Sequence, residues 1–224
     1  MLIAEDFLLM ALDVDSGRTR PGLGMLRQQR FAAACLLAEL AVQKQAGVRN
    51  DRVHLYEAMP TYHPLLSEAL ASLRERAVLA VGDAIAHLAR QLGDIEPRLI
   101  ESLIARGVLH EGGRRRFLLF GERGYPVRST QARNEALANA LQAASGDTHH
   151  MRAIALLLLA DGSGSLPLLV DEQAANEGKA RAHAFTEEVR EVREHSPSTD
   201  LFDVHLASMS LLASIHLALA PAAG

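Results

Sequence analysis

The feature that most constrains the fold is a set of alanine- and leucine-rich runs with apolar residues at helical spacing. The clearest run, Met25 to Gln43 ("MLRQQRFAAACLLAELAVQ"), predicts a core helix. Only 4% of the residues are aromatic and none is Trp, so aliphatic side chains must build the core, which favours helices over a β-sandwich. The sequence predicts a mainly α-helical protein, with a single globular domain over residues 1–224.

Helical patterns and turn signals cover most of the rest of the chain. A short hairpin is expected over Val48 to Ala58, turning at Asn50-Asp51. A second, protruding hairpin is expected over about 108–120, where "VLH" and "RRRFLLF" flank the turn "EGG". Further helices are expected over 2–13, 64–76, 81–93, 94–107, 129–145, 149–165, 171–195 and 197–220.

Charge and hydropathy limit the classes of partner. The net charge is −4, so any binding of polyanions must be local. Of 23 basic residues only Lys44 and Lys179 are lysines, a bias that indicates a GC-rich bacterial genome. The strongest apolar run, Ala153 to Ala160, is shorter than the roughly 20 residues that span a bilayer, and the N-terminus has no signal-peptide pattern. These features predict a cytoplasmic or peripheral membrane protein.

No motif indicates an enzyme. The pairs "GLG" and "GSG" do not complete a nucleotide-binding pattern, and no serine lies in a nucleophile elbow. The adjacent His149 and His150 point about 100° apart on a helix, so they are unsuited to one metal ion. Cys35 lies in an apolar helix and is expected to be a buried, inert thiol. We therefore expect no catalytic residue, no metal and no cofactor.

The stretch Gly107 to Val127 places three arginines beside "FLLF", and three interpretations compete. It can be an ordinary half-buried hairpin whose arginines keep a strand edge soluble. It can be the wing of a winged-helix nucleic-acid binder, although Glu101 in the preceding helix and the negative net charge disfavour this. It can be a membrane-surface device, in which arginines meet acidic headgroups and an apolar tip inserts.

The order of the segments resembles the Golgi phosphoprotein 3 family. The resemblance runs from about Glu5 to Phe185 through "EDFLLMALDVDSGR", "CLLAELAVQ", "PTYHPLLSEAL", "LIARGVLHEGGRRRFLLFGERGYPV" and "AIALLLLADGSGSLPLLVDEQ". It implies a predominantly helical domain with a protruding β-hairpin and no catalysis. Eukaryotic members are peripheral Golgi proteins that bind phosphatidylinositol 4-phosphate and glycosyltransferase tails, and their hairpin takes part in self-association and membrane contact. That hairpin corresponds to Val108 to Phe120 here.

The residues of the family's lipid pocket are not matched in this chain. Eukaryotic members have a Trp in the loop before the "CLLAEL" helix, an Arg two residues before its Cys, and two basic residues ahead of the "GVL" helix. Here Trp is absent, Ala33 precedes Cys35 by two, and Gly93 and Glu96 stand at about the last two positions. Nearby cations can form a different anion site or simply a solvated face; they are Arg18, Arg20, Arg27 and Arg30.

The sequence thus predicts a non-enzymatic adaptor or peripheral membrane protein of this family that binds anionic lipid headgroups. The alternative is a protein-interaction module without lipid binding that self-associates through the hairpin, and the third is a winged-helix nucleic-acid binder, although no nucleic-acid partner is expected. A protein partner and a homo-oligomer are possible on the resemblance. The predicted contact residues of the hairpin are Arg114, Arg115, Arg116, Phe117, Leu118, Leu119 and Phe120.

Overall fold

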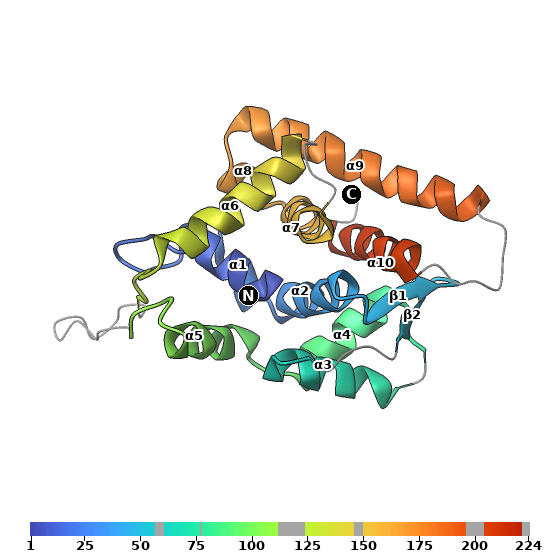
Figure 1. The fold of residues 1–224 in the computed structure, drawn as a ribbon, viewed down its shortest axis with the longest axis horizontal. Coiled ribbons are helices and arrows are strands. Elements are labelled where there is room, and N and C mark those ends of the chain that lie inside the picture. The colour runs from blue at the N-terminus through green and yellow to red at the C-terminus, as the bar shows by residue number, and fades with distance from the viewer. Residues whose placement is uncertain (57–60, 77, 112–123, 146–149, 196–203, 221–224) are drawn as a thin grey trace.

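Three helices form the centre of the fold: α1 (Ile3–Ala11), α2 (Gln29–Val42) and α7 (Met151–Gly162). All of α1 and residues 31–41 of α2 are buried, which explains why these helices are mostly apolar around their whole circumference. Figure 1 shows the computed structural model, with the other helices arranged around them. It describes the chain except for residues 57–60, 77, 112–123, 146–149, 196–203 and 221–224.

The remaining elements lie on two sides of this centre. In Figure 1, α3, α4 and α5 lie on one side of α1 and α2, and α6, α8 and α9 lie on the other. Helix α10 packs against α7, α2 and β1. The described residues thus confirm the predicted mainly helical class. The bounds are η1 (Gly24–Arg27), β1 (Ala46–Arg49), β2 (Arg52–Leu55), α3 (Pro64–Arg74), α4 (Val81–Gln91), α5 (Ile95–Ala105), α6 (Thr130–Ser145), α8 (Leu166–Leu169), α9 (Glu172–His195) and α10 (Val204–Leu219).

The hairpin predicted about Asn50-Asp51 is confirmed as the antiparallel pair β1–β2. Its register opposes Val48 to Val53 and Arg49 to Arg52. Asn50 and Asp51 have φ of 51° and 58°, the left-handed conformation that a two-residue hairpin turn requires and that Asn and Asp tolerate.

The second predicted hairpin is described only at its flanks. Leu109 forms an isolated antiparallel bridge with Val127, and the His110 amide donates to the Pro126 carbonyl over 2.9 Å. The two arms of the predicted hairpin therefore lie side by side at residues 109–110 and 126–127. All seven predicted contact residues fall within 112–123, outside the described residues.

The helix predicted from Met25 to Gln43 is wrong at its N-terminal end. Residues 24–27 form the short 3-10 turn η1, and Gln28 is extended, with ψ of 106°. The carbonyl of Gln28 then accepts the amides of Phe31 and Ala32 at the start of α2. The apolar pattern continues across this break because Met25 and Leu26 before the bend and Phe31 after it are all buried. The short helix α8 was also not expected.

Candidate functional site

The basic loop, defined as residues 12–28, connects α1 to α2 and begins with a tight turn. Asp13 Oδ1 accepts hydrogen bonds from the backbone amide and the hydroxyl of Ser16, over 2.8 and 2.6 Å. These bonds lower the pKa of Asp13, because they favour its charged form. The turn closes at Gly17, whose φ of 62° suits glycine.

This loop is bonded to the segment that follows the second predicted hairpin. The Tyr125 amide donates to the Gly17 carbonyl over 2.8 Å, and the Val127 amide donates to the Val14 carbonyl over 3.1 Å. A Cβ atom at Gly17 would lie 2.0 Å from the Tyr125 carbonyl carbon, and one at Gly124 would lie 2.1 Å from the Ser16 carbonyl oxygen. The two backbones therefore touch, and the loop packs against residues 124–127.

Arg20 binds the backbone carbonyls at the C-terminal end of α1. Its Nη2 donates to the Met10 carbonyl over 2.7 Å, and its amide donates to the Ala11 carbonyl over 2.8 Å. A cation at a helix C-terminus also interacts favourably with the helix dipole. Burial and the neighbouring charge of Arg133 lower the pKa of Arg20. Its Nε is buried and has no hydrogen-bond acceptor in the part of the chain that the structure describes.

Arg27 lies in a different neighbourhood. Its Nε is 3.7 Å from Glu96 Oε2 near the start of α5, and its Nη2 donates to Thr19 Oγ1 over 3.4 Å. Gln29 reaches the same helix end and donates to Asp94 Oδ1 over 3.3 Å. The charge of Arg27 is therefore balanced by Glu96 near the start of α5.

The four predicted lipid-binding residues do not share one pocket in the described contacts. Arg18 lies beside Gly124, Arg20 at the end of α1, and Arg27 beside α5, while Arg30 is exposed at the start of α2. At the positions that the family resemblance makes basic, Ala33 is fully buried and uncharged, and Glu96 is an acid. The loop therefore offers separate cations rather than one preformed phosphoinositide pocket.

A buried ionic network lies at the N-terminal end of α1, and the sequence did not predict it. Its carboxylates are Glu5, Asp6 and Glu39, which are 0%, 2% and 3% exposed. Arg152 donates to Asp6 Oδ2 over 2.7 Å and to both oxygens of Glu39 over 3.1 and 3.2 Å. Glu5 pairs with Arg106 of the α5 C-terminus and accepts the Leu2 amide over 2.8 Å. The sequence does carry a signal for this network, because acids lie inside otherwise apolar helices and a buried acid requires a hydrogen-bonding or charged partner.

Asp6 makes the stability of this network depend on pH. Burial raises the pKa of Asp6 from 3.8 to about 6, although the charge of Arg152 opposes the rise. A raised carboxyl pKa means that the folded state binds the proton more tightly, so this contribution to stability is lost as pH rises toward 6. Between about pH 4.5 and about pH 7 the wild type should lose about 2 kcal/mol relative to Asp6→Asn.

Urea unfolding of wild type and Asp6→Asn across this range measures that difference. Comparing the two variants cancels the other titrating groups that they share. A difference in unfolding free energy that stays constant with pH, or a wild type that gains stability relative to Asp6→Asn as pH rises, would contradict the assignment.

His216 lies at the centre of a hydrogen-bond chain that joins α7, α9 and α10. Its Nδ1 is 3.1 Å from Thr186 Oγ1 and its Nε2 is 2.8 Å from Asp161 Oδ2. The order resembles that of a nucleophilic triad, but Thr186 is 6% exposed and its hydroxyl donates to the Ala182 carbonyl over 2.9 Å. The chain therefore ties α10 to α7 and α9 rather than presenting a nucleophile to a substrate.

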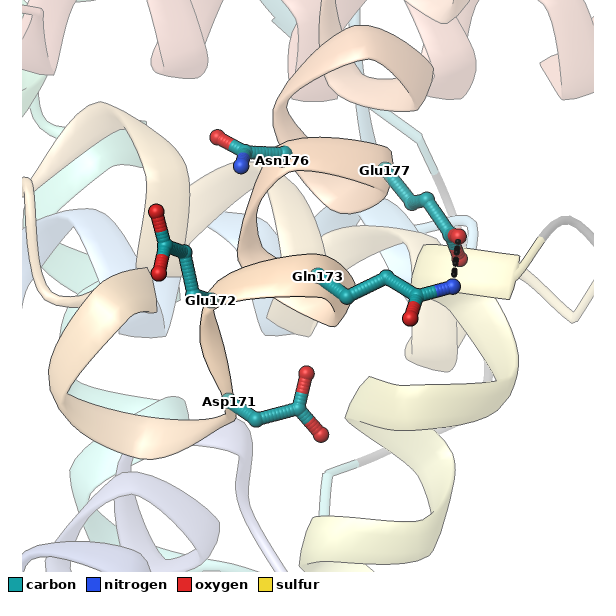
Figure 2. A pocket seen from close by; sticks show the side chains of 5 residues that line it. All are labelled: Asp171, Glu172, Gln173, Asn176 and Glu177. Atoms are coloured by element: carbon teal, nitrogen blue, oxygen red, sulfur yellow. Dashed lines mark hydrogen bonds between the residues drawn. The ribbon is translucent and has the colours of Figure 1, made fainter.

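The thiol, the potential metal ligands and the surface hollow of the described residues do not form a site for an anionic ligand. Cys35 is buried, and burial raises the pKa of its thiol, as expected for an unreactive core cysteine. Within the described ranges, no group of three metal-ligating side chains occurs, and no helix is both long and apolar enough to cross a membrane. The surface hollow in Figure 2 is acidic, with Gln173 donating to Glu177 over 2.9 Å; it is lined by Asp171, Glu172, Gln173, Asn176 and Glu177.

Comparison with known families places the chain in a family of non-enzymatic, lipid-binding adaptors. The matching family model is described as Golgi phosphoprotein 3 (GPP34), and it covers residues 3–199 of the 224. The chain therefore belongs to the Golgi phosphoprotein 3 (GPP34) family. A search of curated proteins gave no match. The family assignment confirms the resemblance read from the sequence and the prediction of a non-enzymatic protein.

Proposed function

We propose that this protein is a peripheral membrane adaptor that binds anionic lipid headgroups. The observation that carries the proposal is the contact between the basic loop and residues 124–127. This contact joins the loop carrying Arg18 and Arg20 to the arm that follows "RRRFLLF" in the sequence. A membrane-facing surface with both phosphate-binding cations and apolar residues would follow from that arrangement.

The binding we propose is electrostatic and only weakly selective among anionic lipids. Each cation close to an anionic leaflet contributes on the order of 1 kcal/mol, and salt weakens that contribution. A phosphoinositide-selective pocket is disfavoured, because Arg27 is paired with Glu96 and Ala33 is buried. We also propose that residues 1–224 form one domain, that the protein is cytoplasmic and that its source is bacterial.

The second candidate is a protein-interaction adaptor that does not bind lipid. The acids at the start of α5 favour it, since Glu96 and Asp94 bond to Arg27 and Gln29 at the place where the family resemblance implies cations. In this case the segment 108–120 would mediate self-association, and a protein partner would replace the membrane. A concentration-dependent oligomer that fails to bind vesicles would favour this candidate.

The deciding experiment is co-sedimentation with vesicles at low and moderate salt. Neutral phosphatidylcholine vesicles are compared with vesicles that also contain phosphatidylinositol, its 4-phosphate, or cardiolipin. Binding to all anionic vesicles that is lost with added salt supports the proposal. Binding to the 4-phosphate alone would show a selective pocket, and binding to none would leave the protein-interaction candidate. Retention on DNA in a parallel assay would instead support the nucleic-acid alternative.

The double variant Arg114→Glu with Arg116→Glu should weaken binding to anionic vesicles about thirtyfold or more. The estimate takes about 1 kcal/mol for each cation that is lost near the leaflet. Helical circular dichroism should be unchanged. The matched control is Arg74→Glu with Arg90→Glu, which makes the same change in net charge at exposed positions of α3 and α4. Equal losses in the two double variants would mean that net charge, rather than the arginine run, determines binding.

A further inference from the structure

Two partly buried guanidinium groups lie where α1, the basic loop and α6 meet. Arg20 is fixed there by its bond to the Met10 carbonyl at the end of α1. Arg133 stands in the first turn of α6, and α6 packs directly against α1. The Nε atoms of both arginines are buried, and neither has a hydrogen-bond acceptor among the described residues. Buried donors without acceptors are uncommon in folded proteins and call for an explanation.

The two arginines carry like charges that repel each other. The charge of Arg133, after burial, is the main influence that lowers the pKa of Arg20. Within the described part of the chain Arg133 makes no ion pair. The acid that acts on Arg20 is Asp13, which is exposed and already bonded to Ser16. Both side chains remain partly open to solvent, so an outside anion can reach the pair.

We propose that Arg20 and Arg133 together bind one phosphate group at the junction of α1, the basic loop and α6. A guanidinium offers paired N–H donors that match two oxygens of a phosphate, and a phosphate dianion can accept from two such forks at once. A carboxylate carries a single charge and would leave one arginine uncompensated. The positive end of the α6 dipole, within one turn of Arg133, adds to the attraction.

The position of the pair suggests where the phosphate comes from. The basic loop that carries Arg20 is bonded to residues 124–127, and α6 begins directly after them at Thr130. A lipid headgroup and a free phosphate offer the same chemistry, so the two sources are separate arms of the test. The lipid form rests on the proposed membrane function, whereas the site itself does not. Arg27 is not part of it, because Glu96 already accompanies that arginine.

The first arm measures thermal unfolding in inorganic phosphate against chloride at equal ionic strength. Wild type should gain about 2–4 °C in Tm at roughly ten times the dissociation constant. Arg133→Gln should lose this gain, and its Tm without phosphate should equal or exceed that of wild type, because the repulsion is gone. The control is Arg90→Gln, an exposed arginine without an ion pair in the described residues, which should keep the full gain.

The second arm measures binding to phosphatidylcholine vesicles with and without phosphatidic acid. Arg133→Gln should bind the acidic vesicles about tenfold more weakly than Arg90→Gln does. Loss in either arm that is specific to Arg133→Gln supports the site and identifies its source. If Arg133→Gln matches Arg90→Gln in both arms, the site is refuted, even where wild type binds vesicles. If wild type binds no vesicles, the membrane function fails while the phosphate arm still decides the site.

Discussion

Replacing Arg152 by alanine is expected to lower the free energy of unfolding by about 3–5 kcal/mol near neutral pH. The variant leaves Asp6 and Glu39, which are 2% and 3% exposed, without the cation that bonds to both. An uncompensated buried carboxylate is costly because it has lost water and gained no partner. Urea unfolding followed by circular dichroism measures the loss.

The matched control for this variant is Arg193→Ala, which also removes an arginine from an ion pair between residues far apart in the sequence. Its partner Asp51 is 88% exposed in the side chain, so the expected loss is below about 1 kcal/mol. The loss in Arg152→Ala should also shrink as the pH falls, because Asp6 can then take up a proton. A loss no larger than that of Arg193→Ala would show that water, rather than Arg152, compensates the carboxylates.

The sequence predicted the helix that carries these acids but not their partners. Periodicity placed a helix over residues 2–13, and the structure adds that Glu5 near its start accepts the Leu2 amide. The partner of Asp6 lies 146 residues further along the chain. Local spacing carries no information about such pairs, because they are created only when α7 packs on α1.

The candidate site shows the same limit. The density of arginines identified the basic loop, but composition cannot show that Arg27 meets Glu96 or that Arg20 approaches Arg133. Arg133 was not singled out, because a lone arginine in a polar helix resembles any solvated position. The end of the core helix was misplaced for a related reason: buried residues on both sides of a bend at Gln28 keep the apolar period intact.

Gly17→Ala is expected to destabilise the protein by about 2–5 kcal/mol. A left-handed conformation costs an alanine about 1–2 kcal/mol, and a tight backbone contact adds about 1–3 kcal/mol. Both apply here, because φ is 62° and the new Cβ would lie 2.0 Å from the Tyr125 carbonyl carbon. The backbone of Tyr125 cannot move aside as a flexible side chain would. Urea unfolding measures the cost, and vesicle binding by the folded fraction should also fall.

Gly93→Ala separates the two causes. Gly93 has φ of 63°, almost that of Gly17, but a Cβ there would have no heavy atom within 4 Å. It should therefore show only the conformational cost, about 1–2 kcal/mol. The remaining difference, about 2 kcal/mol, measures how tightly the basic loop is held against residues 124–127. If the two alanine variants were equally stable, the loop would not be docked there in solution. The surface proposed to meet the membrane would then lose its structural basis, whatever the vesicles showed.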